Sequence, residues 1–287
     1  LFLFSYALLG PLHYLTEISW LHKRQFFTPN KKDYILLAII TVLISIPNVV
    51  PFLYSKFGPR DISGNVIYSP DIIATFTQWG EALPGLIFCS FGIAALLLLT
   101  TNTTKRIIGL ILIAIIAYLV HAEKFATVLF SVFLPTLVHV FVFTGAFILL
   151  GALRSKSTSG ILSFVVFLLC GVSLFVLFPN TITPPSPSAM HRYDQAFLIF
   201  NQQVIDFFLH KTVSREMVYF SGFGIMISRF IAFAYTYHYL NWFSKTSVIK
   251  WHLIPKKWLV SVIVLWLASV ALYAYDYRTG LIALYFL

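Results

Sequence analysis

The chain has 287 residues, of which 59% are apolar and only 10% carry a formal charge, whereas charged residues make up about 25% of a typical soluble domain. So few charges do not cover the surface of a water-soluble globule of this size, and a soluble monomer is excluded. Two cysteines exclude a disulfide-rich scaffold. The net charge of +10 does not indicate nucleic-acid binding, because Lys and Arg in membrane proteins gather in the cytoplasmic loops.

The apolar residues form long runs, and about eight of these runs approach the roughly 20 residues that a helix needs to cross a bilayer. Uninterrupted runs indicate helices, because strands of a membrane barrel alternate apolar and polar residues over about 10 positions. The spans are expected near residues 1–21, 34–54, 84–100, 107–122, 125–151, 160–178, 217–241 and 257–275. The sequence therefore predicts an all-α, polytopic membrane helix bundle, with residues 1–287 in a single transmembrane domain.

Two connecting segments are long enough to hold structure of their own, and both are expected on the outer side. Residues 55–83 contain DIIATFTQWGE, a stretch that can lie along the membrane interface. Residues 179–216 contain HRYDQAFLIFNQQVIDFFLH, whose mixed apolar and polar residues fit an interfacial helix.

The basic residues are divided unequally between the two sides of the predicted bundle. Alternate loops, beginning with 22–33, carry 12 Lys and Arg residues, and the other, longer loops carry seven. Because cytoplasmic loops carry the excess of Lys and Arg, the 22–33 loop is expected inside. Residues 1 and 287 are then on the non-cytoplasmic side of a cytoplasmic (inner) membrane.

Five ionisable residues fall inside the predicted spans: His13, Glu17, His139, Arg229 and His238. Each such group costs a few kcal/mol in a bilayer and needs a partner or a function. His13 and Glu17 stand four residues apart, so they share one helix face. They can ligate a metal together, or they can simply form a hydrogen bond within the bundle.

Proline precedes two of these histidines, with Pro11 two residues before His13 and Pro135 four residues before His139. Proline removes a backbone donor and bends a membrane helix, and polar groups beside such a bend often line a cavity. The alternative for His139 is a hydrogen bond to a carbonyl in a packed interface. Counting about 1.5 Å of rise per residue from the cytoplasmic boundary predicts two levels, with His13 and His139 near the middle and Glu17 nearer the cytoplasm.

On the same count His238 belongs to the cytoplasmic level and Arg229 to the middle level. The stretch 233–245 around His238 is rich in polar aromatic residues. With Arg229 it offers candidate substrate-binding residues, namely Tyr235, Asn241 and Trp242. The same composition is typical of an aromatic belt at the interface.

The sequence contains no nucleotide-binding loop, no nucleophile elbow and no zinc-protease motif. The function favoured by the intramembrane groups is a metal-dependent enzyme, such as an oxidoreductase, that acts on a lipid-soluble substrate. His13, Glu17, His139 and His238 are the candidate metal ligands. Imidazole with carboxylate suits non-haem iron or zinc.

Other functions fit the same residues. His13 and His139 could ligate haem. The chain could be an accessory or assembly subunit of a larger membrane complex, haem- or quinone-associated, whose polar groups bond between helices. A transporter is less favoured, because the sequence shows no internal repeat. The expected partners are membrane lipids and, for a subunit, other proteins of the complex, but not nucleic acid.

Overall fold

The structure is a computed structural model that describes residues 1–24, 28, 30, 32–122, 128–177, 185–245, 253 and 255–286. These residues are almost entirely helical and contain no β-strand. The chain divides into two compact units. The larger unit comprises residues 1–25 and 132–287, and the smaller unit comprises residues 26–131.

Several helices have the length and composition of membrane spans, which supports an integral membrane protein with multiple spans. Among the described residues five qualify: Asp33–Phe57, Pro70–Leu99, Val132–Ser155, Thr158–Val176 and Lys256–Tyr275. Three further helices, α1 (Phe2–Arg24), α4 (Thr103–Ala122) and α11 (Gly222–Ser244), coincide with other predicted spans. The count of eight spans and the single transmembrane domain stay predictions.

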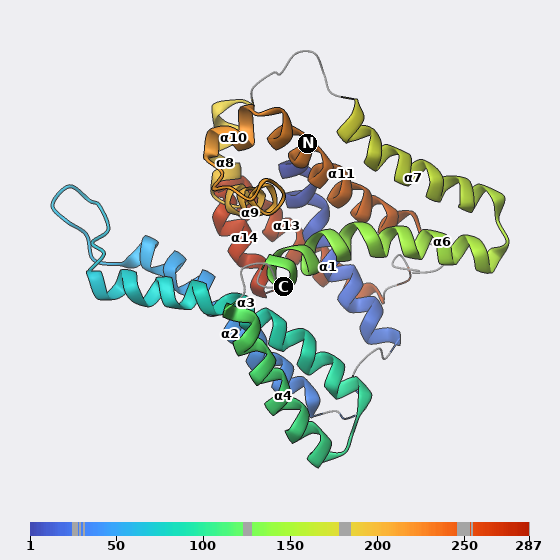
Figure 1. Cartoon of the computed structure of the whole chain (residues 1–287), viewed down its shortest axis with the longest axis horizontal. Coiled ribbons are helices and arrows are strands. Elements are labelled where there is room, and N and C mark those ends of the chain that lie inside the picture. Colours follow the sequence, from blue (N-terminus) through green and yellow to red (C-terminus); the bar gives the residue numbers. More distant parts are fainter. Residues whose placement is uncertain are drawn as a thin grey trace. The chain divides into compact units, whose positions relative to one another are not determined.

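The smaller unit consists of α2 (Asp33–Phe57), α3 (Pro70–Leu99) and α4, with α3 packed against both other helices (Figure 1). Its core forms around Ile40, Ile93 and Leu97. Gly109 of α4 lies against Leu96 of α3, where a Cβ atom would be 2.5 Å from the leucine Cδ1 atom. The glycine therefore permits the close approach of these two helices, as is usual for small residues in membrane bundles.

A buried ion pair joins the first turns of α2 and α4. The two Nη atoms of Arg106 donate to the two carboxylate oxygens of Asp33 at 2.7 and 2.8 Å. The Asp33 side chain is 5% exposed and that of Arg106 is 15% exposed. Arg106 also donates through Nε to the Thr100 carbonyl at 2.7 Å, so the pair closes one end of this unit.

The predicted loop at 55–83 ends earlier than expected, because α3 begins at Pro70 and runs without interruption to Leu99. Ser69 caps this helix by accepting a hydrogen bond from the Ile72 amide, and proline is well suited to the first helical position. The stretch DIIATFTQWGE is therefore the first part of a long apolar helix. It is not a separate interfacial helix.

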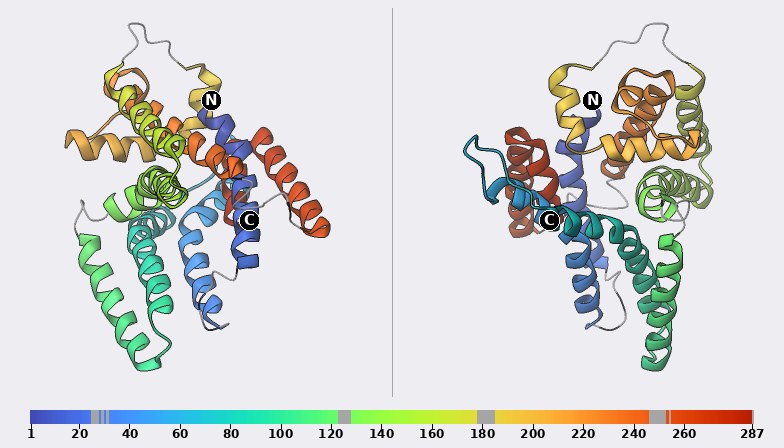
Figure 2. Two further views of the ribbon diagram at one scale, coloured as in Figure 1. Left: turned by 90° about the vertical axis from the view of Figure 1, so that its right-hand side faces the viewer. Right: turned by 60° about the vertical axis from the view of Figure 1, so that its left-hand side comes forward.

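In the larger unit, α1 packs against both α11 and α13 (Lys256–Tyr275) (Figure 2). Hydrogen bonds join α1 to its neighbours, since Ser5 bonds Thr236 at 2.8 Å and the Trp266 indole donates to the Leu8 carbonyl at 2.8 Å. After α13 the chain continues into α14 (Tyr277–Ala283) and a 3₁₀ turn at Leu284–Phe286. Such interhelical bonds favour association in lipid, where apolar surface alone does not.

The segment with Pro135 forms a π-helix, η1 (Leu129–Val142), followed by α6 (Phe143–Ser155). We expected a bend here, and a π-helix is another way in which a helix accommodates a residue without an amide donor. α6 packs against α7 (Thr158–Val176), which in turn packs against α11. Phe141 of η1 stacks on Phe167 of α7, with ring centroids 4.6 Å apart.

The second predicted loop, 179–216, contains two helices, α8 (Pro187–Asp194) and α9 (Leu198–Leu209), and the start of α10 (Arg215–Phe220). Its residues 179–184 lie outside the described part of the chain. Asp194 ties α8 to α10, because it accepts hydrogen bonds from Arg215 at 2.8 and 2.9 Å and from the Tyr219 hydroxyl at 2.6 Å. The predicted single interfacial helix is thus broken in two after Asp194.

Candidate functional site

One face of α1 supplies the first half of the candidate site. His13, Thr16 and Glu17 lie three and four residues apart, and this spacing aligns side chains on a helix. The Nε2 atom of His13 is 3.3 Å from the Oε2 atom of Glu17. His13 is 1% exposed, whereas the Glu17 side chain is 29% exposed, so the histidine lies inside and the carboxylate lies at the edge.

α11 supplies the second half. The Nε2 atom of His238 is 3.2 Å from the Nε2 atom of His13. Trp242, one turn further along α11, donates its indole N–H to the Thr16 hydroxyl at 3.0 Å, and its ring centroid lies 5.0 Å from that of His13. The adjoining Tyr239 ring, 1% exposed, lies 5.4 Å from the His13 ring. The two imidazoles are therefore held between aromatic rings, and the Trp242–Thr16 bond fixes the two helices.

The third element is the segment that runs from η1 into α6. The Thr144 hydroxyl is 2.8 Å from His238 Nδ1. The His139 ring centroid is 5.4 Å from that of His238, although the His139 side chain is itself exposed. His139 belongs to η1 and Thr144 to the first turn of α6, and both lie beside His238.

Hydrogen bonding accounts for part of this cluster. Thr144 occupies His238 Nδ1, which leaves His238 Nε2 directed at His13. His13 Nδ1 is buried and has no hydrogen-bond partner among the described residues. Within that same part of the chain, no group of three or more His, Cys, Asp or Glu side chains is arranged so that it could hold a metal ion as it stands.

The structure brings His13, Glu17 and His238 together, with His139 beside them. This differs from the two expected levels, in which His238 was to lie nearer the cytoplasm than His13. Depth counted along separate helices assumes that they are parallel to the membrane normal. Here a short stretch of α11 contacts nearly all of α1, because Tyr235 lies against Phe2 and Trp242 lies against Trp20. Helices that cross in this way place side chains of different counted depth side by side.

The candidate substrate-binding residues are spread along α11. Trp242 belongs to the cluster. Tyr235 is buried about two turns before Trp242 and lies against Phe2 and Tyr6. Asn241 accepts a hydrogen bond from Ser244 through its backbone carbonyl. Arg229 donates to the carbonyl of Leu177 at the end of α7, at 3.3 Å. A positive group at a helix C-terminus is stabilising in itself, and a role for these residues in substrate binding stays a prediction.

Sequence reasoning did not identify Thr16 and Thr144 as members of the site, and it placed Tyr239 only in the polar aromatic stretch around His238. Thr144 is an ordinary polar residue in an apolar segment, and only the packing of α6 beside α11 directs it to His238. Thr16 shares the helix face of His13 and Glu17, so its spacing was the one available signal. Tyr239 adjoins His238 but reads equally well as part of an aromatic belt.

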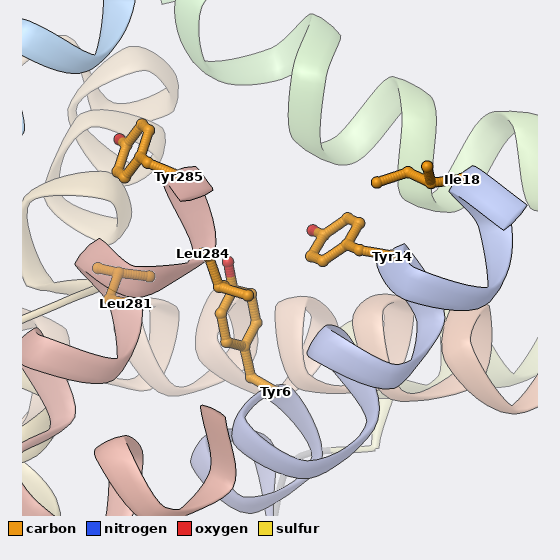
Figure 3. Close-up of a pocket in the computed structure, with 6 residues that line it drawn as sticks. All are labelled: Tyr6, Tyr14, Ile18, Leu281, Leu284 and Tyr285. Atoms are coloured by element: carbon orange, nitrogen blue, oxygen red, sulfur yellow. The ribbon is translucent and has the colours of Figure 1, made fainter. Parts of the chain in front are cut away.

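A pocket of about 340 Å³ lies next to this cluster, between α1 and the end of the chain (Figure 3). Tyr6, Tyr14 and Ile18 line it from α1, and Leu281, Leu284 and Tyr285 line it from the C-terminal segment. The Tyr14 ring centroid is 5.5 Å from that of His13. The pocket and the imidazole pair are thus neighbours along α1.

Neither a known protein family, nor a curated protein, nor a solved structure matches this chain. The function therefore has to be inferred from the side chains of the site. The site combines two buried imidazoles with a carboxylate at its edge and is bordered by a pocket.

Proposed function

We propose that this integral membrane protein is a metal-dependent enzyme that acts on a lipid-soluble substrate, with its metal ion held by His13, His238 and Glu17. The observation that carries the proposal is the position of His13 Nε2, which is 3.2 Å from His238 Nε2 and 3.3 Å from Glu17 Oε2. A ring nitrogen has either one N–H or one lone pair, so it forms a well-directed hydrogen bond to only one of two such neighbours. A metal ion in place of the proton attracts all three atoms.

The distances from His13 Nε2 to the other two atoms suit shared ligation, and the side chains would have to adjust to surround one ion. Two ligands with bonds of about 2.0–2.2 Å lie roughly 3.0–3.5 Å apart, depending on the angle between the bonds, and both observed distances fall in that range. His139, with its ring 5.4 Å from that of His238, is placed to add a ligand after rotation of its side chain. Nitrogen and carboxylate ligands suit non-haem iron or zinc.

Haem does not fit the pair formed by His13 and His238. Axial ligands bind opposite faces of the iron, and two nitrogens 3.2 Å apart leave no space for the macrocycle between them. A small ion needs no such space, so this pair favours iron or zinc. Haem ligation by His13 and His139 stays a prediction.

The surrounding residues support ligation in two ways. Thr144 can accept the Nδ1–H of His238, which leaves the Nε2 lone pair for a metal, and such outer partners orient ligating histidines. The rings of Tyr239 and Trp242 cover the His13 imidazole and exclude water. Glu17 lies at the exposed edge, where the carboxylate oxygen that does not bind the ion can accept a proton from a bound molecule. When bound, the ion would supply a Lewis acid, or a redox centre if it is iron.

Metal analysis of the full chain purified in detergent tests the proposal, with zinc and ferrous iron as the added ions. We expect about one equivalent of one of these ions per chain, as a single shared site implies. His13→Ala and His238→Ala should lose it. Thr144→Val, which keeps the side-chain shape, should weaken affinity by about 10- to 100-fold. His191→Ala is the matched control, because His191 lies on α8 and contacts Gln195.

The proposal is wrong if the wild-type chain takes up no more zinc or iron than the variant that lacks both His13 and His238. Glu17→Gln and Thr144→Val guard against loss of fold, since both variants preserve the shape of the side chain. Wild-type affinity in both of them would also contradict the proposal.

A further inference from the structure

The pocket beside the imidazole pair has the features of a binding site for a neutral lipid. Its six lining side chains are three tyrosines and three aliphatic residues, and none of them is charged. Its volume of about 340 Å³ is within the range of about 300–1,000 Å³ that is usual for small-molecule sites. Figure 3 shows Tyr6 and Tyr14 on α1 facing Leu284 and Tyr285 across the pocket.

The tyrosine hydroxyls of this region require an acceptor. The hydroxyl of Tyr14 neighbours those of Tyr6 and Tyr239. The Tyr239 hydroxyl is buried and has no hydrogen-bond partner among the described residues, and an unpaired hydroxyl is costly in apolar surroundings. If it donates to the Tyr14 oxygen, the O–H of Tyr14 still needs an acceptor of its own. A ligand oxygen in the pocket would satisfy it.

The charge of the surroundings decides which kind of oxygen this is. None of the side chains that line the pocket is charged, so a carboxylate or phosphate would have no cationic partner there. An unpaired charge is costly where water is scarce. The acceptor is therefore a neutral carbonyl or hydroxyl oxygen. The aliphatic residues Ile18, Leu281 and Leu284 provide the surface for an apolar chain.

We infer that this pocket binds a neutral, lipid-soluble molecule with an apolar chain and a single carbonyl or hydroxyl oxygen, which accepts a hydrogen bond from Tyr14. The Tyr14 ring is 5.5 Å from the His13 ring, so an oxygen bound to the Tyr14 hydroxyl would lie near the imidazole pair. This molecule is the substrate only if the proposed enzymatic function holds, and in that respect the inference rests on the proposed function. Binding of the molecule itself needs no metal.

Photo-crosslinking of the full chain in detergent tests the inference, with a long-chain methyl ketone that carries a diazirine on its chain. The matched probe is the hydrocarbon with the same diazirine but no oxygen. The yield as a function of concentration gives an apparent Kd, and mass spectrometry identifies the labelled peptides. We expect labelling in α1 and in residues 281–285.

Two variants and one control separate the contribution of the Tyr14 hydrogen bond from that of the apolar surface of the pocket. Tyr14→Phe removes one hydroxyl, so the apparent Kd of the ketone should rise about three- to tenfold, the usual effect of one hydrogen bond, and that of the hydrocarbon should not change. Leu284→Trp fills the pocket and should abolish labelling by both probes. Tyr275→Phe, at a side chain that is 83% exposed, should behave like the wild type.

The inference is overturned if Tyr14→Phe leaves the Kd of the ketone unchanged. It is also overturned if labelling falls in the separate apolar cavity around Phe208 and Ile227. The same samples distinguish this inference from the proposed function. Metal uptake without labelling of the pocket refutes the inference alone. Oxygen-dependent labelling without metal uptake refutes the proposed metal and leaves the lipid site in place.

Discussion

The ion pair between Asp33 and Arg106 allows a quantitative test of how the smaller unit is held together. Asp33→Ala removes two charge-assisted hydrogen bonds of 2.7 and 2.8 Å at a side chain that is 5% exposed. Removing one partner of a buried pair costs about 3–5 kcal/mol. Arg106 keeps its hydrogen bond to the Thr100 carbonyl, so its charge is not wholly unpaired. We therefore expect a loss near the lower limit, about 3 kcal/mol.

A double-mutant cycle separates the pair from its surroundings. Asp33→Ala, Arg106→Ala and the double variant are compared by the free energy of unfolding of the full chain in bicelles. The coupling energy should be about 2 kcal/mol, within the range of about 0.5–3 kcal/mol found for residues in contact. Lys105→Ala is the control, because Lys105 is exposed next to Arg106 and should change stability by less than about 0.5 kcal/mol. A coupling energy near zero would refute the reasoning.

Burial opposes ionisation of Asp194, but hydrogen bonds from Arg215 and Tyr219 outweigh it and hold the pKa of this carboxyl below its usual value. Its stabilisation is therefore present at neutral pH and is lost as the pH falls below about 4, through the folded pKa. The difference in unfolding midpoint between wild type and Asp194→Asn should shrink there, and a difference that stays constant with pH would contradict this reasoning. The predicted topology is tested with Ser188→Cys and Lys257→Cys in a background without native cysteines. A membrane-impermeant reagent added outside the cell should label Ser188→Cys and should not label Lys257→Cys. Labelling of Lys257→Cys alone from outside would reverse the orientation.

The helices themselves follow from the sequence. A run of apolar residues near the thickness of a bilayer forms a helix because no other structure satisfies its backbone in lipid. The prediction of spans at 160–178 and 257–275 agrees closely with α7, Thr158–Val176, and α13, Lys256–Tyr275. The contact between His13 and Glu17 was also accessible, because residues four apart on one helix always adjoin.

Tertiary structure alone decided which helices meet. His13 and His238 are 225 residues apart, and their pairing depends on the crossing of α1 and α11. The sequence carries no signal for that crossing, since helices in lipid are apolar on most sides and associate through local packing and scattered hydrogen bonds. For the same reason, the sequence did not predict the hydrogen bond between Thr144 and His238 or the ion pair between Asp33 and Arg106. The sequence determined that polar groups lie in these helices, because the residue type and the helix that carries it are local properties. The partner of each polar group was decided only by tertiary structure, because it depends on how two helices pack against each other.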